Sequence, residues 1–336
     1  MGARVVGWSA ALNRTVLVTG GAGFIGSSLA RLLLDRGDAV RILDDLSIGR
    51  QAYLAGVPHE LIAAPLADRS AVDRAVAGAD AVVHLAARAG IPDSVADPLG
   101  TFEVNVAQTM GLLDAARLAG VRRFVFASSN AAAGDHAPPA DETDLPHPIS
   151  PYGASKLAGE AYCQAYAATY GLAAVALRFS NAYGPFSLHK RSVVAAWLRD
   201  AIGGEPITIH GDGEQTRDFV FVADLAAAIV ATIDAPAADV AGEIFQAGTG
   251  RETTINALAE AIAGAVGRPL EIRREPGREG DVRRNVGRVE KAASVLGYRA
   301  AVGLDEGLAR TARWYETALG DRQLAAVVPD AASGSE

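Results

Sequence analysis

The sequence of 336 residues predicts an α/β fold built on a doubly wound parallel sheet. Short apolar runs, typical of buried strands, alternate with helical stretches through the first two thirds of the chain. The first run ends in a glycine-rich turn, and the second ends in an acidic residue. Strands that alternate with helices form a parallel sheet covered by helices on both faces.

The first predicted strand, 15–19, leads into Gly20, Gly23 and Gly26, after which apolar residues recur at helical spacing. Glycines let the backbone approach a pyrophosphate, and the free N–H groups and dipole of a helix N-terminus favour an anion. A glycine-rich turn alone also fits a purely structural role. Its position in a strand–turn–helix unit favours a dinucleotide site.

The second predicted strand, 39–43, is closed by Asp44. An acid about 20 residues beyond the glycines typically hydrogen-bonds the adenosine ribose and repels a 2′-phosphate. Asp44 and the following Asp45 are therefore assigned to the cofactor site, and NAD is the expected cofactor. Arg50 in the next loop leaves NADP as the alternative.

The remaining elements continue the alternation. Further strands are expected at 60–63, 80–85, 122–127 and 173–179, and helices at 25–36, 70–77, 102–119 and 153–169. After Asn181 proline, glycine and histidine interrupt the rhythm, with helices near 191–202, 222–233 and 254–266. We expect a dinucleotide-binding domain at 14–180, a smaller interleaved α/β portion at 181–320 that binds substrate, and extensions at 1–13 and 326–336.

Composition narrows the class of partner. The net charge of −8 argues against nucleic acid, and no apolar run approaches membrane-spanning length. The one cysteine, Cys163, rules out an internal disulfide and suits a reducing cytoplasm. We assign no metal ligands.

The candidate catalytic residues are Ser129, Tyr152 and Lys156. Tyr152 and Lys156 lie one helical turn apart, and therefore on the same face. An ammonium and a cationic nicotinamide nearby favour the phenolate, which lowers the tyrosine pKa toward the working range. Ser129 ends the strand upstream, where a parallel sheet places its ligands. A hydroxyl there can hold the substrate oxygen while Tyr152 removes its proton.

At this point the chain resembles the extended short-chain dehydrogenase/reductase family, in its nucleotide-sugar epimerase/dehydratase branch. The matching motifs are TGGAGFIG, LDDLS, HLAA, FASSNAAAG, PYGASK, RFSNAYGP and GDGEQTRDFVFVADLA, between Val16 and Tyr315. The resemblance implies a Rossmann domain that holds NAD tightly and a C-terminal domain for a nucleoside-diphosphate sugar. It also implies a homodimer formed through the helix after HLAA and the helix that carries PYGASK.

The resemblance assigns roles residue by residue. The pyrophosphate would be held by Gly20, Gly23, Phe24, Ile25 and Gly26, and the cofactor would be lined by Leu66, Leu85, Ala86 and Ala87. Asn105 would support the site and Lys156 would bind the nicotinamide ribose. Asn181, Arg217 and Arg278 match residues that contact the substrate diphosphate, for which guanidinium groups are suited.

Dehydratase relatives carry an Asp-Glu pair directly after the serine position, whereas this chain has Asn130 and Ala131. The expected reaction is therefore epimerisation at C4 of a UDP-hexose through a transient 4-keto sugar, with the cofactor retained. The alternatives are a nucleotide-sugar 4-ketoreductase or dehydrogenase, and a non-catalytic NAD-binding relative. The substrate is of the UDP-glucose type, with UDP-glucuronate as an alternative.

Four features depart from the family pattern or concern specificity. Pro65 replaces the aspartate that contacts adenine, and Ala132-Ala133 replaces a Val-Tyr pair after the serine motif. Asn285 occupies the place of a bulky pocket-closing tyrosine, which leaves room for an N-acetyl group. The basic loop His189–Arg191 lies where relatives position the hexose, so Lys190 or Arg191 is a candidate ligand for a uronate carboxylate.

Overall fold

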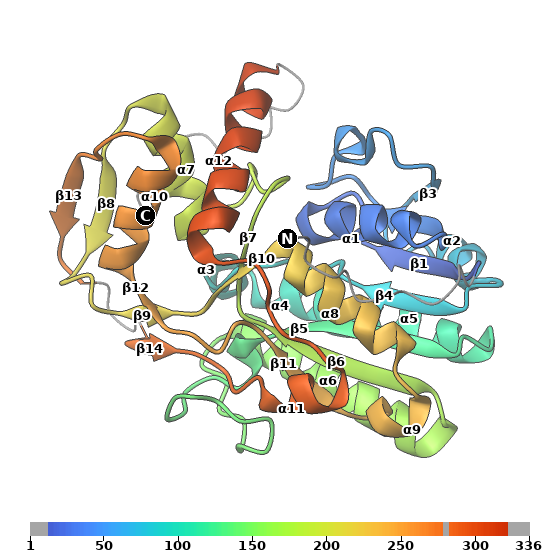
Figure 1. The fold of residues 1–336 in the computed structure, drawn as a ribbon. Helices are drawn as coiled ribbons and strands as arrows, with labels where there is room; N and C mark the ends of the chain where they lie inside the picture. The colour runs from blue at the N-terminus through green and yellow to red at the C-terminus, as the bar shows by residue number, and fades with distance from the viewer. Residues whose placement is uncertain (1–12, 278–281, 322–336) are drawn as a thin grey trace.

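The structure is a computed structural model that describes residues 13–277 and 282–321 (Figure 1). The extensions predicted at 1–13 and 326–336 lie outside the described residues, apart from Asn13. Arg278, a predicted substrate ligand, also lies outside them.

A seven-stranded parallel sheet forms the centre of the protein, in the order β11-β6-β5-β4-β1-β2-β3 (Figure 1). Its strands are β1 (Thr15–Thr19), β2 (Ala39–Asp44), β3 (Glu60–Ala63), β4 (Ala81–His84), β5 (Arg123–Ser129), β6 (Ala173–Phe179) and β11 (Ile244–Ala247). The doubly wound α/β prediction and its six strands are confirmed. The seventh strand, β11, was not predicted.

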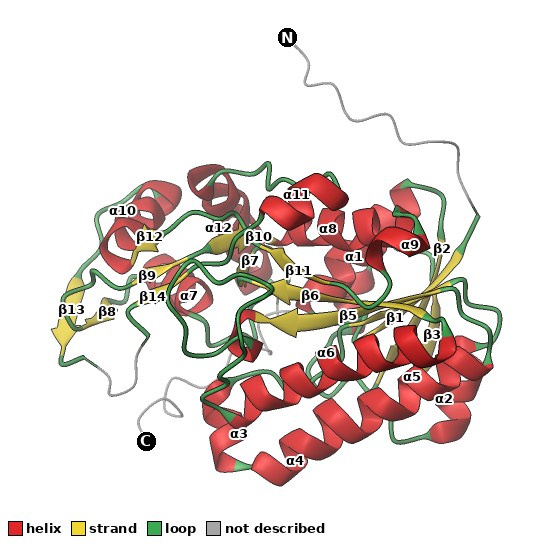
Figure 2. Cartoon of the chain, turned by 90° about the horizontal axis from the view of Figure 1, so that it is seen from below, coloured by secondary structure: helices red, strands yellow, loops and turns green. Residues whose placement is uncertain are grey.

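Helices cover both faces of this sheet (Figure 2). On one face Val16 and Val18 pack in a core with α1 (Phe24–Asp35), α8 (Val222–Asp234) and α11 (Glu290–Val295). On the other, Leu17 and Phe126 pack with α2 (Arg69–Val76), α5 (Gln108–Leu118) and α6 (Pro151–Tyr170). The alternation of side chains along a strand is what sends Val16 and Leu17 to opposite faces.

The helix expected at 102–119 is not one continuous α-helix. It consists of α4 (Pro98–Phe102), a π-helical turn at Glu103–Ala107, and α5. Asn105 is buried within this turn, and its carbonyl accepts a hydrogen bond from the Thr109 hydroxyl at 2.8 Å. A π turn changes which residues face inward, a feature frequent at functional sites, and apolar periodicity does not reveal it.

The remaining elements form a second layer with its own core. It contains α7 (Val193–Gly203), α10 (Ile255–Val266) and α12 (Leu304–Gly320), with Trp197, Leu258 and Tyr315 among its buried residues. Short strand pairs frame it: β7 (Asn181–Tyr183) with β10 (Phe219–Phe221), β8 (Ile207–His210) with β13 (Ile272–Glu275), and β9 (Thr216–Arg217) with β12 (Thr253–Thr254) and β14 (Arg284–Asn285). Since α8 and β11 return to the central sheet, residues beyond 180 contribute to both layers. The boundary at 180 stays a prediction.

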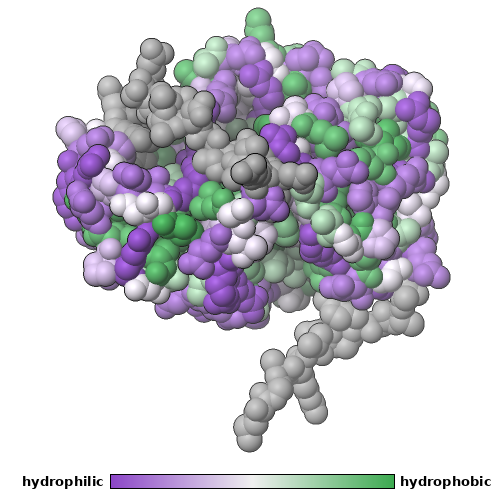
Figure 3. All heavy atoms as spheres, turned by 90° about the horizontal axis from the view of Figure 1, so that it is seen from above, coloured by the Kyte–Doolittle hydropathy of each residue, from purple (hydrophilic) through white to green (hydrophobic). Residues whose placement is uncertain are grey.

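Two short α-helices, α3 (Ile91–Ala96) after β4 and α9 (Ala237–Val240) before β11, complete the fold together with the 3₁₀ turns Gln51–Leu54 and Asn130–Ala132. The face opposite to that of Figure 2 mixes hydrophilic residues with scattered hydrophobic ones (Figure 3). Among the described residues, no helix has the length and apolar character needed to span a membrane.

Candidate active site

The turn between β1 and α1 is built on glycines. Gly20 has φ of +68°, a conformation that L side chains rarely adopt, and a Cβ there would lie 2.8 Å from the backbone nitrogen of Ala86. A Cβ on Gly26 would collide with the Gly20 carbonyl. The turn is therefore packed tightly against the segment that follows β4, which brings Leu85, Ala86 and Ala87 beside it.

The N-terminus of α1 is suited to an anion. Gly23 caps the helix without a side-chain hydrogen bond, and the first turn carries no acidic residue. Phe24 and Ile25 begin the helix, so the free N–H groups and the positive end of the dipole are open to a ligand. The glycine cradle and this helix end fit the pyrophosphate of a dinucleotide.

Asp44 ends β2 and also fastens the glycine turn. Its Oδ2 accepts a hydrogen bond from the backbone of Ala22 at 2.9 Å, and its Oδ1 accepts one from Leu46 at 2.8 Å. Burial raises its pKa, while these two hydrogen bonds oppose the rise. The sequence pointed to Asp44 as a ribose ligand but not to this second role. Asp45 is exposed and accepts a hydrogen bond from the backbone of Ser47.

Asn105 connects the cofactor side to the catalytic helix. Its Oδ1 accepts a hydrogen bond from the Arg88 backbone at 2.8 Å, and its Nδ2 donates to the Arg88 carbonyl and to Ser155 Oγ at 3.0 Å each. These bonds tie the segment after β4 to α6. The geometry fits the supporting role expected for Asn105.

Ser129, Tyr152 and Lys156 meet where α6 lies against the carboxyl end of β5. The approach is close because glycines stand at the contact: a Cβ on Gly153 would collide with the Ala131 carbonyl just after β5, and one on Gly159 with the Phe126 ring of β5. Lys156 Nζ donates to the Ala127 carbonyl at 2.8 Å and lies 5.8 Å from the centre of the Tyr152 ring.

The protein's own groups do not lower the Tyr152 pKa as expected. Burial raises the pKa of the Tyr152 phenol, and a hydrogen bond with Ser129 only opposes the rise. Burial also lowers the pKa of Lys156 to about 8, although the charge of Glu160 acts in the other direction. Desolvation therefore dominates the Tyr152 pKa in the polypeptide alone, and the lowering expected from Lys156 together with a cationic nicotinamide stays a prediction.

The predicted substrate ligands gather in part around Asp218, which is fully buried. Asn181 Nδ2 donates to the Asp218 carbonyl at 3.2 Å, and Arg217, the preceding residue, donates to the Val282 carbonyl at 2.7 Å. Arg217 and Asn285 are partners in the register of β9 and β14. Asp218 was not among the predicted site residues, and its carboxylate accepts hydrogen bonds from Ser180 and Thr249.

The side chains of the basic loop His189–Arg191 contact different parts of the protein. Lys190 Nζ lies 4.9 Å from the centre of the Phe24 ring at the start of α1, and burial lowers its pKa to about 8. Arg191 is exposed and lies 3.9 Å from the Asp93 carboxylate of α3. Among the described residues, no group of three or more His, Cys, Asp or Glu side chains is placed to hold a metal ion.

This fold and this site define a class, the nicotinamide-dinucleotide-dependent short-chain dehydrogenases/reductases. Comparison with known proteins defines the family within it. Residues 16–248 match the model of the NAD dependent epimerase/dehydratase family, and the chain belongs to this family.

Individual relatives cover nearly the whole chain. A UDP-glucose 4-epimerase of Mycolicibacterium smegmatis is 41% identical over 89% of this chain and 97% of its own. The crystal structure of a Thermotoga maritima UDP-glucose 4-epimerase with UDP-glucose has a TM-score of 0.85 and 35% identity, covering 91% of this chain and 99% of that one. The Thermus thermophilus UDP-glucose 4-epimerase complex with NAD has a TM-score of 0.81 and 36% identity, over 90% and 99%.

Proposed function

We propose that the protein is an NAD-dependent C4 epimerase of a UDP-hexose that works through a transient 4-keto sugar. The observation that carries this proposal is the contact of Ser129 with Tyr152 at the carboxyl edge of the sheet, beside Lys156. The two residues after Ser129 are Asn130 and Ala131, so no carboxylate stands there to remove water from the sugar.

Each catalytic side chain has one task. Bound NAD supplies the acceptor and donor of a hydride. The Ser129 hydroxyl holds the 4-oxygen of the sugar, and Tyr152 removes and later returns the proton of that oxygen. Lys156 holds a positive charge next to the phenol, which favours the phenolate when the proton leaves.

The substrate diphosphate is assigned to Asn181, Arg217 and Arg278. Two guanidinium groups suit a doubly charged diphosphate, since each presents parallel N–H donors. Asn181 and Arg217 both lie beside Asp218, next to the end of β6. The asparagine at 285 leaves space for an N-acetyl group on C2.

UDP-glucuronate is a second candidate substrate, with Lys190 or Arg191 as the ligand of its carboxylate. The Lys190 ammonium lies against Phe24, beside the proposed cofactor site. Lys190→Ala should then reduce turnover of UDP-glucuronate more than that of UDP-glucose. Arg310→Ala, at a surface ion pair with Glu306, is the matched control, and Arg191→Ala tests the other candidate ligand of the loop. Equal losses on both sugars in Lys190→Ala would remove this candidate.

We propose a homodimer formed through the helices after β4 and through α6. Exposed apolar side chains gather on α3 and α4: Ile91, Val95, Leu99 and Phe102, of which Leu99 is 80% exposed. Such a concentration of apolar surface marks an interaction site. Light scattering should give the mass of two chains, and Leu99→Asp with Phe102→Asp should give one. A wild-type protein of single-chain mass would contradict the proposal.

The cytoplasm is the proposed location, because Cys163 is free and buried and suits a reducing compartment. Cell fractionation that recovers the protein outside the cytoplasmic fraction would contradict this.

Substitution of Tyr152 by Phe tests the catalytic assignment. It removes the proton-transferring hydroxyl and should lower turnover about 10²- to 10⁴-fold with the NAD content unchanged. Tyr162→Phe is the matched control, because Tyr162 lies on the same helix but is 39% exposed. A Tyr152→Phe protein with wild-type turnover would overturn the assignment.

A further inference from the structure

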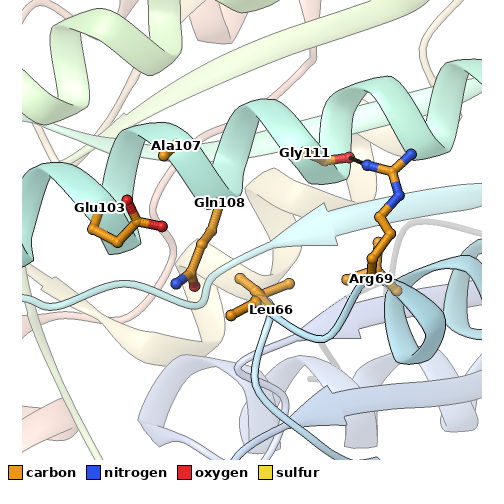
Figure 4. A pocket seen from close by; sticks show the side chains of 8 residues that line it. Leu66, Arg69, Glu103, Ala107, Gln108 and Gly111 are labelled. Carbon is orange, nitrogen blue, oxygen red and sulfur yellow. Dashed lines mark hydrogen bonds between the residues drawn. The ribbon is translucent and has the colours of Figure 1, made fainter.

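A cavity of about 230 Å³ lies between α2 and the helical segment that contains the π turn. Leu66 and Val72 line it on one side, and Glu103, Ala107 and Gln108 line it on the other. Figure 4 shows the Gln108 side chain extending from the helix toward Leu66, with Glu103 on the same wall. The cavity therefore combines an apolar floor with three polar side chains, those of Arg69, Glu103 and Gln108.

The polar side chains of this cavity differ in their hydrogen bonds and ion pairs. Arg69 Nη1 donates to the Gly111 carbonyl at 3.0 Å, and the same guanidinium pairs with Asp73. Gln108 is half-buried, and no residue in the described part of the chain forms a hydrogen bond with its amide. Glu103 is exposed to solvent. The Gln108 amide is thus the polar group of this cavity that is half-buried and has no hydrogen-bond partner among the described residues.

The cavity adjoins the proposed ribose ligand. Asp44 ends β2, and its carbonyl accepts a hydrogen bond from the Ala64 backbone at 3.1 Å, just after β3. Leu66 follows two residues later. The nicotinamide half of the cofactor extends toward Tyr152, beyond β4 and β5, so the base attached to the ribose extends the other way, toward β3.

The turn after β3 offers few groups to an adenine ring. Ala64, Pro65 and Leu66 carry no polar side chain, and Pro65 has no backbone N–H. Adenine presents an amino group that donates and a neighbouring ring nitrogen that accepts. A glutamine amide matches this edge with one acceptor and one donor.

We propose that Gln108 binds the Watson–Crick edge of the adenine of NAD, with Oε1 accepting from the amino group and Nε2 donating to the ring nitrogen. Leu66 and Val72 supply the apolar floor of this subsite. The inference rests on the NAD site of the proposed function and adds a residue that replaces the missing acceptor at position 65.

The test is dinucleotide affinity, measured by calorimetry on the full chain freed of cofactor, with NAD and its 1,N6-etheno derivative as probes. The etheno bridge joins the amino group to the neighbouring ring nitrogen, so this dinucleotide cannot pair with a glutamine amide. Wild type should therefore bind NAD about 3- to 10-fold more tightly than the etheno derivative. Gln108→Leu should lose this difference, because its side chain forms no hydrogen bond with either probe.

Glu103→Gln is the matched control in the same cavity and should leave both affinities unchanged. If Gln108 serves only to pack the helix, Gln108→Leu will change the affinities for both dinucleotides by the same factor and leave their ratio as in wild type, which overturns the inference. A wild-type protein that binds neither dinucleotide would instead contradict the proposed function. The two failures are therefore distinguishable.

Discussion

The side chain of Asn130 donates a hydrogen bond of 3.2 Å to Oδ1 of Asn285. Asn130 follows Ser129, the proposed catalytic serine, at the end of β5, whereas Asn285 belongs to β14 of the second layer. Asn130 also lies 3.3 Å from the Ser180 hydroxyl. The contact therefore fixes the side chain at position 285 relative to Ser129, and position 285 is where the size of the sugar pocket is expected to be set.

The Asn285→Tyr substitution should narrow the pocket. A phenol ring would fill the space left for a C2 N-acetyl group, so kcat/KM for UDP-N-acetylglucosamine should fall about tenfold or more relative to that for UDP-glucose. Asn285→Ala breaks the bond to Asn130 without filling the space and should not lower this ratio. A ratio unaffected by Asn285→Tyr would show that this side chain does not limit the pocket.

The pH profile should report Lys156. Its lowered pKa of about 8 means that the ammonium is present below pH 8 and is lost as the pH rises, so kcat/KM should decline with an alkaline limb near pH 8. Lys156→Arg keeps its charge and should remove the limb, whatever its residual activity. Lys291→Arg, at a surface ion pair with Glu243, should leave the profile unchanged. A kcat/KM that stays unchanged up to pH 10 would contradict the assignment.

The free energy of unfolding should rise with pH over the range in which kcat/KM falls. The Lys156 pKa is below its unfolded value of about 10.4, so the folded state holds this proton more weakly than the unfolded state. The contribution of Lys156 to the free energy of unfolding should therefore rise between pH 8 and about pH 10. Denaturant titrations of wild type and Lys156→Met should show this rise in wild type alone. The same slope in both proteins would place the titrating group elsewhere.

A buried ion pair supports the catalytic helix. Glu160 lies one turn beyond Lys156 on α6 and forms two hydrogen bonds of 2.8 Å with Arg178 of β6, both side chains being 1% exposed. Ser128 also donates to Glu160. Glu160→Leu leaves the Arg178 charge unpaired and should cost about 3–5 kcal/mol of unfolding free energy. The double variant Glu160→Leu, Arg178→Met should recover much of this lost unfolding free energy. A double variant no more stable than the single one would contradict this.

Asp44 should determine the choice between NAD and NADP. Its carboxylate repels a 2′-phosphate, so Asp44→Asn should reduce the preference for NAD about tenfold, measured as the ratio of the two dissociation constants. An asparagine keeps one oxygen to accept from Ala22, as Asp44 does. Asp114→Asn is the control, because that carboxylate pairs with Arg117 on α5. An unchanged ratio in Asp44→Asn would assign the discrimination to another residue.

The sequence predicts the parts of this fold that depend on local pattern. The glycine turn, Asp44 and the six strands from Thr15 to Phe179 were found because strand periodicity and glycine spacing are short-range signals. Strand β11 was missed because its four residues, three of them apolar, are too few to distinguish a strand from a core helix by periodicity.

Contacts between distant segments escaped the sequence reading. The bond between Asn130 and Asn285 joins residues 155 positions apart, and no local pattern anticipates it. Asp218 was missed because an aspartate beside apolar residues gives no sign of burial. The raised Tyr152 pKa likewise depends on burial, which only packing determines. Motif spacing indicated which residues meet at the site, but not the environment in which they meet.

The most direct test is to incubate the purified protein, with no added cofactor, in separate tubes with UDP-glucose, UDP-N-acetylglucosamine and UDP-glucuronate. Proton NMR of the anomeric and H4 signals would then report any C4 epimer. The account predicts that at least one sugar converts to its galacto isomer, and that the Tyr152→Phe protein leaves all three unchanged. No conversion of any sugar, even after NAD is added, would contradict it.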